Sequence, residues 1–261
     1  VYLTGQAQAA AADDYFTSFI TSPVAPVVFA LLFMGVTSFI VYNGVEGGIE
    51  RVSKYMMPIL LVLVVIIAGY SLTLKHTDEA GQLRTGIEGF LYYLTPHFEG
   101  LTVGRFFQIL LDAMSQLFFS LSVSMGIMIT YGSYVKPEVN LNRAVNQIEI
   151  FDTGVALLAG AMIIPAVYVF SGTEGMSAGP SLMFVSLPKV FAAMGKAGNV
   201  VGILFFVTTI FATLTSCISV LESITANCME IFHTGRKKTV LVLTVIYLTA
   251  SAVIALGYSI F

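Results

Sequence analysis

The sequence predicts an all-α membrane protein, and its composition and long apolar segments are the main reasons. Of its 261 residues, 57% are hydrophobic and only 10% are charged, and the mean hydropathy is +0.88. A chain of this kind has too few charged residues to cover the surface of a soluble domain. A helix of about 20 apolar residues crosses a bilayer core roughly 30 Å thick. The net charge of -3 gives no indication of a nucleic-acid partner.

Six segments are long and apolar enough to be transmembrane helices. They are residues 24–42, 56–74, 106–134, 148–170, 200–228 and 239–261. The more polar segment 1–23 is expected to form an extracellular loop. Seven lysines and arginines fall in the connections on one side of these spans and five on the other. Cytoplasmic loops tend to carry more cations, so the side with seven is predicted to be cytoplasmic. The first span therefore runs inward and the last one outward.

The connection between the fourth and fifth spans is too apolar to be a free loop. Residues 175–198 are expected to form an extracellular helical hairpin, broken at or near Pro188. Such a hairpin would either form a re-entrant lid or simply pack over the ends of other helices. Pro58 is predicted in the first turn of the second span, and Pro165 is predicted to kink the fourth.

The third span contains an unusual polar segment between Gln116 and Gly126. Ser120, Ser122 and Ser124 alternate with apolar residues there. In a continuous helix, such hydroxyls bond to carbonyls of the preceding turn. A break near 120–125 is the other interpretation, and irregular backbone is tolerated within a bilayer only where it lines a cavity or is buried in protein. Free carbonyls suit a monovalent cation and a half-helix N-terminus suits a carboxylate, so the segment indicates an ion and solute site.

Other polar residues occur inside the predicted spans. Asp152 is the most informative, because an acid at the bilayer centre costs about 2.5 to 3.5 kcal/mol on insertion scales; the alternative is that it reaches the cytoplasmic surface. The hydroxyls of residues 213–216 either bind an ion or join helices. Glu222 is predicted to be a structural acid paired with another helix or with backbone donors, and direct ion binding is the alternative. Asp112 is compatible either with packing or with a position on a pathway. The sequence shows no catalytic triad, metal-ligand spacing or phosphate loop, so enzymatic activity is not expected.

Several of these segments together resemble one family. The residues are Gly47–Lys54 with Met57 and Pro58, Leu94–Pro96, Gln116–Gly126, Ile129–Tyr134 and Leu214–Ser216. They are similar to the neurotransmitter:sodium symporter family, especially its prokaryotic sodium-dependent amino-acid transporters. The resemblance implies part of an inverted-repeat, broken-helix transporter. It covers roughly the fourth to ninth of about twelve helices, so a fragment of a longer chain is expected.

The resemblance also implies a set of site residues. Sodium ligands would be Ser120 and Asp152 at one site, and Ala212 (through its carbonyl), Thr215 and Ser216 at a second. The substrate pocket would include Phe119, Ser122, Met125, Ser216 and Val220, and the inner gate Tyr134 and Glu230. Two residues depart from the family pattern: Asp152 stands where asparagine is usual, and Ser124 where glycine is common.

The function implied by the resemblance is sodium-coupled symport of a hydrophobic or aromatic amino acid across the plasma membrane by alternating access. The expected location is the bacterial inner membrane, with several spans. Two Na⁺ sites are expected in the complete protein and no chloride requirement, because Ala156 replaces a serine of the chloride site and Asp152 can supply the negative charge. The expected partners are the amino acid, sodium ions, the lipid bilayer and the missing spans of the full-length chain. The alternative is a truncated, non-transporting membrane fragment.

Overall fold

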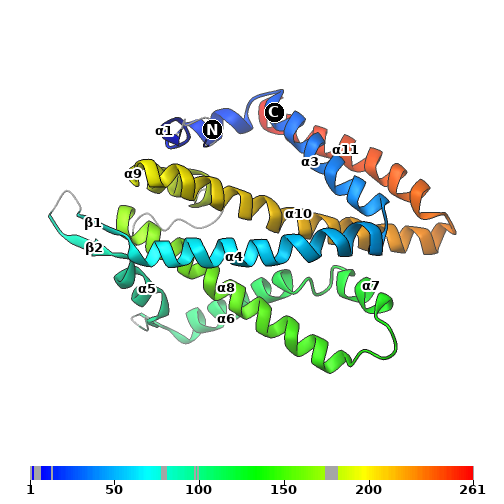
Figure 1. Cartoon of the computed structure of the whole chain (residues 1–261), viewed down its shortest axis with the longest axis horizontal. Helices are drawn as coiled ribbons and strands as arrows, with labels where there is room; N and C mark the ends of the chain where they lie inside the picture. The colour runs from blue at the N-terminus through cyan, green and yellow to red at the C-terminus, as the bar shows by residue number, and fades with distance from the viewer. Residues whose placement is uncertain are drawn as a thin grey trace.

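The computed structural model describes residues 2, 7–12, 14–77, 81–96, 98, 100–173 and 182–260, and this part of the chain is almost entirely helical (Figure 1). The helices are α1 (Ala7–Ala10), α2 (Tyr15–Ile20), α3 (Ala25–Tyr42), α4 (Arg51–Thr73), α5 (Gly86–Leu94), α6 (Val103–Ser120), α7 (Ile127–Tyr134), α8 (Leu141–Ser171), α9 (Leu187–Ala193), α10 (Lys196–Phe232) and α11 (Arg236–Ile260). Strands β1 (Lys75–Thr77) and β2 (Leu83–Thr85) form an antiparallel hairpin. Two π-helical turns, Val45–Glu50 and Leu182–Ser186, precede α4 and α9.

Five of the described helical segments are long and apolar enough to cross a membrane. They are Ala25–Tyr42, Val45–Thr73, Leu141–Ser171, Lys196–Phe232 and Arg236–Tyr258. The remaining predicted span, 106–134, consists of the separate helices α6 and α7. The predicted all-α membrane fold with a broken helix is therefore confirmed. Several helices begin earlier than their apolar segments, because polar residues can continue a helix beyond the hydrocarbon region.

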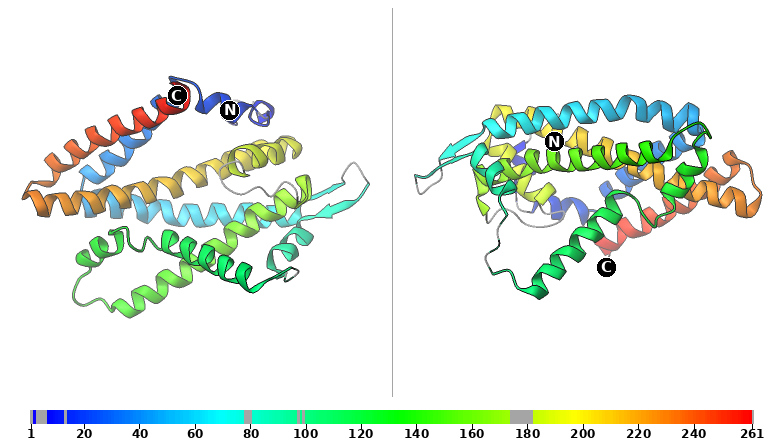
Figure 2. Two further views of the ribbon diagram at one scale, coloured as in Figure 1. Left: turned by 180° about the vertical axis from the view of Figure 1, so that it is seen from behind. Right: turned by 90° about the horizontal axis from the view of Figure 1, so that it is seen from below.

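The long helices are arranged in layers (Figures 1 and 2). Helix α4 packs between α8 and α10, and α3 packs against α11 and α10. Helix α5 covers part of α8. Helix α6 buries none of its residues. The layers thus hold α8 and α10 firmly, while α6 stands apart from them.

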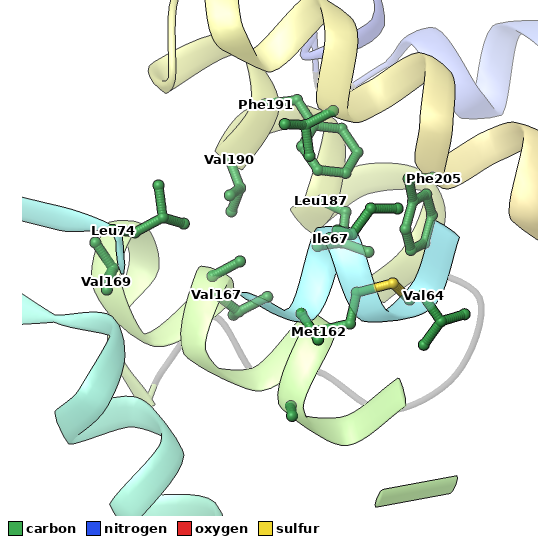
Figure 3. Close-up of a cluster of buried hydrophobic side chains, with 14 of the residues drawn as sticks. Val64, Ile67, Leu74, Met162, Val167, Val169, Leu187, Val190, Phe191 and Phe205 are labelled. Carbon is green, nitrogen blue, oxygen red and sulfur yellow. The ribbon is translucent and has the colours of Figure 1, made fainter. Parts of the chain in front are cut away.

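A cluster of buried apolar side chains joins α4, α8, α9 and α10 (Figure 3). Ile67 of α4, Val167 of α8, Val190 of α9 and Phe205 of α10 are all at most 4% exposed. Because lipid tails are as apolar as these side chains, close van der Waals packing rather than escape from water holds such helices together in a bilayer. A second cluster, which includes Ile40, Ile218 and Val240, joins α3, α10 and α11.

Proline positions differ from the sequence predictions in two places. Pro58 lies inside α4 and not in a first turn, because the helix begins well before its apolar segment. Pro188 occupies the first turn of α9, where its missing N–H costs nothing, and the chain turns at Met194 and Gly195 instead. Residues 175–181 of the predicted hairpin, and Phe261 of the last predicted span, lie outside the described residues. Pro165 lies within α8.

Candidate functional site

The break between α6 and α7 occupies residues 121–126, inside the serine-rich segment. Ser122, Ser124 and Gly126 have left-handed backbone, with φ of 54°, 68° and 75°. For residues other than glycine this conformation costs about 1–2 kcal/mol each. Such strain is found mainly where surrounding structure enforces it, and it is concentrated at functional sites. The break is therefore a candidate binding site.

A side-chain hydrogen bond connects the end of α6, next to the break, to α8. The Ser120 hydroxyl, at the end of α6, donates to Asp152 Oδ1 over 2.5 Å. Asp152 lies well inside α8, about 16 Å along the helix from its first residue at 1.5 Å per residue. Two of the predicted sodium ligands, which are 32 residues apart in the sequence, are thus brought into contact.

The other predicted sodium ligands lie within one turn of α10. The Thr215 hydroxyl donates to the Ala212 carbonyl over 2.9 Å, and the Ser216 hydroxyl donates to the same carbonyl over 3.2 Å. Neither hydroxyl bonds to another helix within the described ranges. The alternative interpretation was that these hydroxyls join helices. Within the described residues, these two side chains do not.

Helix α7 is attached to α10 by three polar contacts. Thr130 donates to Ser223 over 3.2 Å, and the hydroxyls of Tyr131 and Ser219 lie 3.0 Å apart. Tyr134 donates to Glu222 Oε1 over 2.7 Å. Ser223 also lies beneath the end of the break, where a Cβ added to Gly126 would come within 3.1 Å of its hydroxyl. The short half-helix is therefore held in register with α10.

Glu222 is fully buried and forms an ion pair with Arg236 at the start of α11. Arg236 Nη1 donates to Glu222 Oε1 over 3.0 Å, and Nη2 donates to Oε2. The same guanidinium donates to the Val41 carbonyl at the end of α3, through Nε over 3.1 Å and Nη2 over 3.0 Å. A cation is favoured at a helix C-terminus. Glu222 is thus a structural acid paired with another helix, as predicted.

The structure does not bring together every residue that was predicted to act jointly. Tyr134 bonds to Glu222, while Glu230, the other residue predicted at the inner gate, is exposed near the end of α10. Phe119, Met125 and Val220 are exposed, so the described residues do not enclose a substrate pocket around them. Ser122 lies in the break and Ser216 on α10.

Arg236 is the partner of Glu222 that the sequence alone does not identify. In the sequence it is one of three consecutive cations, with Lys237 and Lys238, in the connection before the last span. Glu222 is the feature of the sequence that could have pointed to Arg236, since a buried acid in a span needs a nearby cation.

Comparison with known proteins points to one family of transporters. The pattern of the Sodium:neurotransmitter symporter family (SNF) matches residues 20–259. An uncharacterized sodium-dependent transporter of Bacillus subtilis, YhdH, is 38% identical over 223 residues, which are 85% of this chain and 46% of the relative. A second such transporter, MJ1319 of Methanocaldococcus jannaschii, is 32% identical over 236 residues, which are 88% of this chain and 46% of the relative.

A solved structure is also similar to this chain. MhsT in complex with L-phenylalanine superposes with a TM-score of 0.80 and 36% identity, covering 99% of this chain and 56% of MhsT. The chain spans about half the length of the curated relatives it matches. From these matches and from the helical architecture described above, the chain belongs to the sodium:neurotransmitter symporter family of multi-pass membrane proteins.

Proposed function

We propose that this chain is part of a sodium-coupled symporter for a hydrophobic or aromatic amino acid in the plasma membrane. The observation that carries the proposal is the contact between Ser120 and Asp152, which joins the break to an acid inside a span. A carboxylate and a hydroxyl oxygen are suitable ligands for a small hard cation, and irregular backbone beside them offers free carbonyls. The family and the sodium-dependent relatives support the sodium coupling.

The proposal includes two sodium sites. Ser120 and Asp152 would hold one ion beside the break. The Ala212 carbonyl with the Thr215 and Ser216 hydroxyls would hold the other, because their hydrogen bonds keep three oxygens within one turn. When a cation approaches, its charge competes with these hydrogen bonds for the oxygen lone pairs. Ion binding would therefore fix side chains on α6, α8 and α10 together.

The amino acid would bind at the break itself. The first backbone N–H groups of α7 have no helical partner and form a positive helix end, which suits a carboxylate. The exposed apolar side chains Phe119, Met125 and Val220, with Ser122 and Ser216, would surround its side chain. The neighbouring MhsT structure contains L-phenylalanine. Sodium would order the break, the amino acid would bridge it to α10, and the two would cross together.

The inner end of the path would be closed where α7 meets α10. Tyr134 and Glu230 are the proposed gate residues, and the observed bond from Tyr134 to Glu222 adds a fixed attachment at this level. Breaking that attachment is required if α7 is to move away from α10. Alternating access would use this movement to expose the site inward.

A sodium titration of phenylalanine binding to the complete protein tests the proposed function. Saturable binding is expected in sodium chloride and not in potassium chloride at equal ionic strength, because sodium is the proposed coupling ion. Lysine serves as the control amino acid, since its charge does not suit an apolar subsite. Equal phenylalanine binding in both salts would contradict sodium coupling. Liposomes with only residues 1–261 test the alternative of a non-transporting fragment, and we expect no sodium-driven uptake from them.

A second expected result is that the complete transporter works without chloride. Asp152 lies one helical turn before Ala156 on the same face of α8. Its carboxylate can balance the sodium charge in a low-dielectric site, where opposite charges attract strongly, so a bound anion would be redundant. Initial uptake rates with chloride replaced by gluconate should be unchanged. A large loss in gluconate would overturn this expectation, whereas Asp152→Asn with Ala156→Ser should create a chloride requirement.

A further inference from the structure

The hydroxyl of Ser219 on α10 makes hydrogen bonds in two directions. Ser219 Oγ donates to the Thr215 carbonyl, one turn earlier in the helix, over 3.1 Å, and it lies 3.0 Å from the Tyr131 hydroxyl of α7. A serine hydroxyl has a single proton, so Ser219 accepts from Tyr131 while it donates to Thr215. The bonds therefore run in one direction, from Tyr131 through Ser219 to Thr215. We call these three residues the relay.

The relay joins two parts of the proposed transport site. At one end, Thr215 belongs to the turn of α10 that contains the Ala212 carbonyl and the proposed second sodium site. At the other end, Tyr131 lies four residues, or about 6 Å, beyond Ile127, the first residue of α7. The free N–H groups at that end of α7 are the proposed attachment for the carboxylate of the amino acid. The relay thus runs from the sodium turn to the half-helix that would hold the amino acid.

The other two polar contacts between α7 and α10 do not continue to the sodium turn. Thr130 donates to Ser223, and Tyr134 donates to Glu222, both further along α10. Within the part of the chain that the structure describes, the side chains of Ser223 and Glu222 have no hydrogen bond to the turn that contains Thr215. These contacts attach α7 to α10, whereas the relay also connects α7 to the proposed ion site.

We propose that Ser219 is a positioning residue that couples sodium binding on α10 to amino-acid binding at α7. This rests on the proposed sodium-coupled symport and adds a route between its two sites. An ion held by the Thr215 turn fixes the carbonyl to which Ser219 donates, and Ser219 in turn fixes the Tyr131 hydroxyl. The half-helix is then already in position when the amino acid arrives, so the amino acid binds more tightly. By the same linkage, the bound amino acid raises the affinity for the ion.

Phenylalanine binding to the complete transporter, measured at low and at saturating sodium, tests the proposal. The ratio of the two dissociation constants is the coupling factor. Ser219→Ala should lower this factor about fivefold, as expected for the loss of one hydrogen bond, and Tyr131→Phe should lower it equally. The double variant should lower it no further, because either change interrupts the same relay. Ser219→Thr keeps the hydroxyl and should retain the coupling.

Thr130→Val is the matched control for these variants. It removes a side-chain hydrogen bond of similar length between α7 and α10 that does not lead to Thr215. It should lower the thermal stability of the transporter and leave the coupling factor unchanged. Binding of ²²Na⁺ without amino acid should change little in any of the variants, because neither Ser219 nor Tyr131 is a proposed sodium ligand.

The outcomes separate this proposal from the one on which it depends. If the unmodified transporter binds phenylalanine equally at low and at saturating sodium, the proposed sodium coupling is wrong. If its binding depends on sodium and Ser219→Ala and Tyr131→Phe leave the coupling factor unchanged, only the relay is wrong. An equal loss of coupling in Thr130→Val, or additive losses in the double variant, would assign the coupling to the whole contact between α7 and α10, and the relay is again rejected.

Discussion

Replacement of Arg236 by alanine in the complete protein is expected to destabilise it by about 3–5 kcal/mol, the cost of leaving one partner of a buried ion pair alone. Glu222 is fully buried, and Arg236 is its cation. The substitution also removes the donors to the Val41 carbonyl at the end of α3. We expect a strong loss of folded transporter, measured as a lower midpoint of thermal aggregation and a lower yield in mild detergent.

The reason for this loss can be checked with partner variants. Glu222→Gln combined with Arg236→Ala removes the unpaired charge, so it should recover much of the lost stability. Arg236→Lys keeps the charge but cannot reproduce a planar fork that reaches Glu222 and Val41 together, and it should be intermediate. Lys238→Ala is the matched control, since it removes an exposed cation two residues away. Equal stability of the Arg236→Ala and double variants would contradict the explanation by charge.

The second large effect concerns the hydroxyls of α10. Thr215→Val with Ser216→Ala removes two of the three oxygens proposed for one sodium site and leaves only the Ala212 carbonyl. At about 1 kcal/mol for each of the two lost polar contacts, the sodium concentration for half-maximal amino-acid binding should rise on the order of 30-fold. Sodium titration of amino-acid binding to the complete protein measures it. Helix stability should change little, because both side chains bond only within α10.

Thr213→Val is the control for this experiment. Thr213 lies in the same hydroxyl cluster and donates to the Thr209 carbonyl over 2.8 Å, so it makes the same kind of bond to its own helix. It is not among the proposed ligands. A sodium curve that is unchanged in the double variant, or shifted equally by Thr213→Val, would show that these oxygens do not hold the ion.

Much of the helical fold could be predicted because apolar length and polar interruptions are local properties. The serines around Ser122 predict broken backbone without knowledge of the rest of the chain, and Asp152 is conspicuous inside an apolar span. Helix ends were less predictable. Pro58 appeared to mark a first turn only because the residues before it are polar, although they continue the helix back to Val45 through a π-helical turn.

Partners across helices were the part that the sequence could not predict. Tyr134 can reach an acid on α10, but Glu222 and Glu230 lie two turns apart on that helix, and only the packing of α7 selects Glu222. In the same way, Arg236 became the partner of Glu222 because the turn after α10 directs α11 back toward α3. These choices depend on the positions of three helices at once.

Helix α10 has a further consequence through its length. Its 37 residues form a rod about 55 Å long, nearly twice the thickness of the hydrocarbon core. Thr215 and Ser216 lie close to its midpoint, roughly 28 Å from the end at Lys196. A relative tilt of about 10° around that midpoint would displace each end by roughly 5 Å in opposite directions, while the two hydroxyls would hardly move. An ion held by these hydroxyls, as proposed, would therefore stay in place while the two ends of the helix moved in opposite directions.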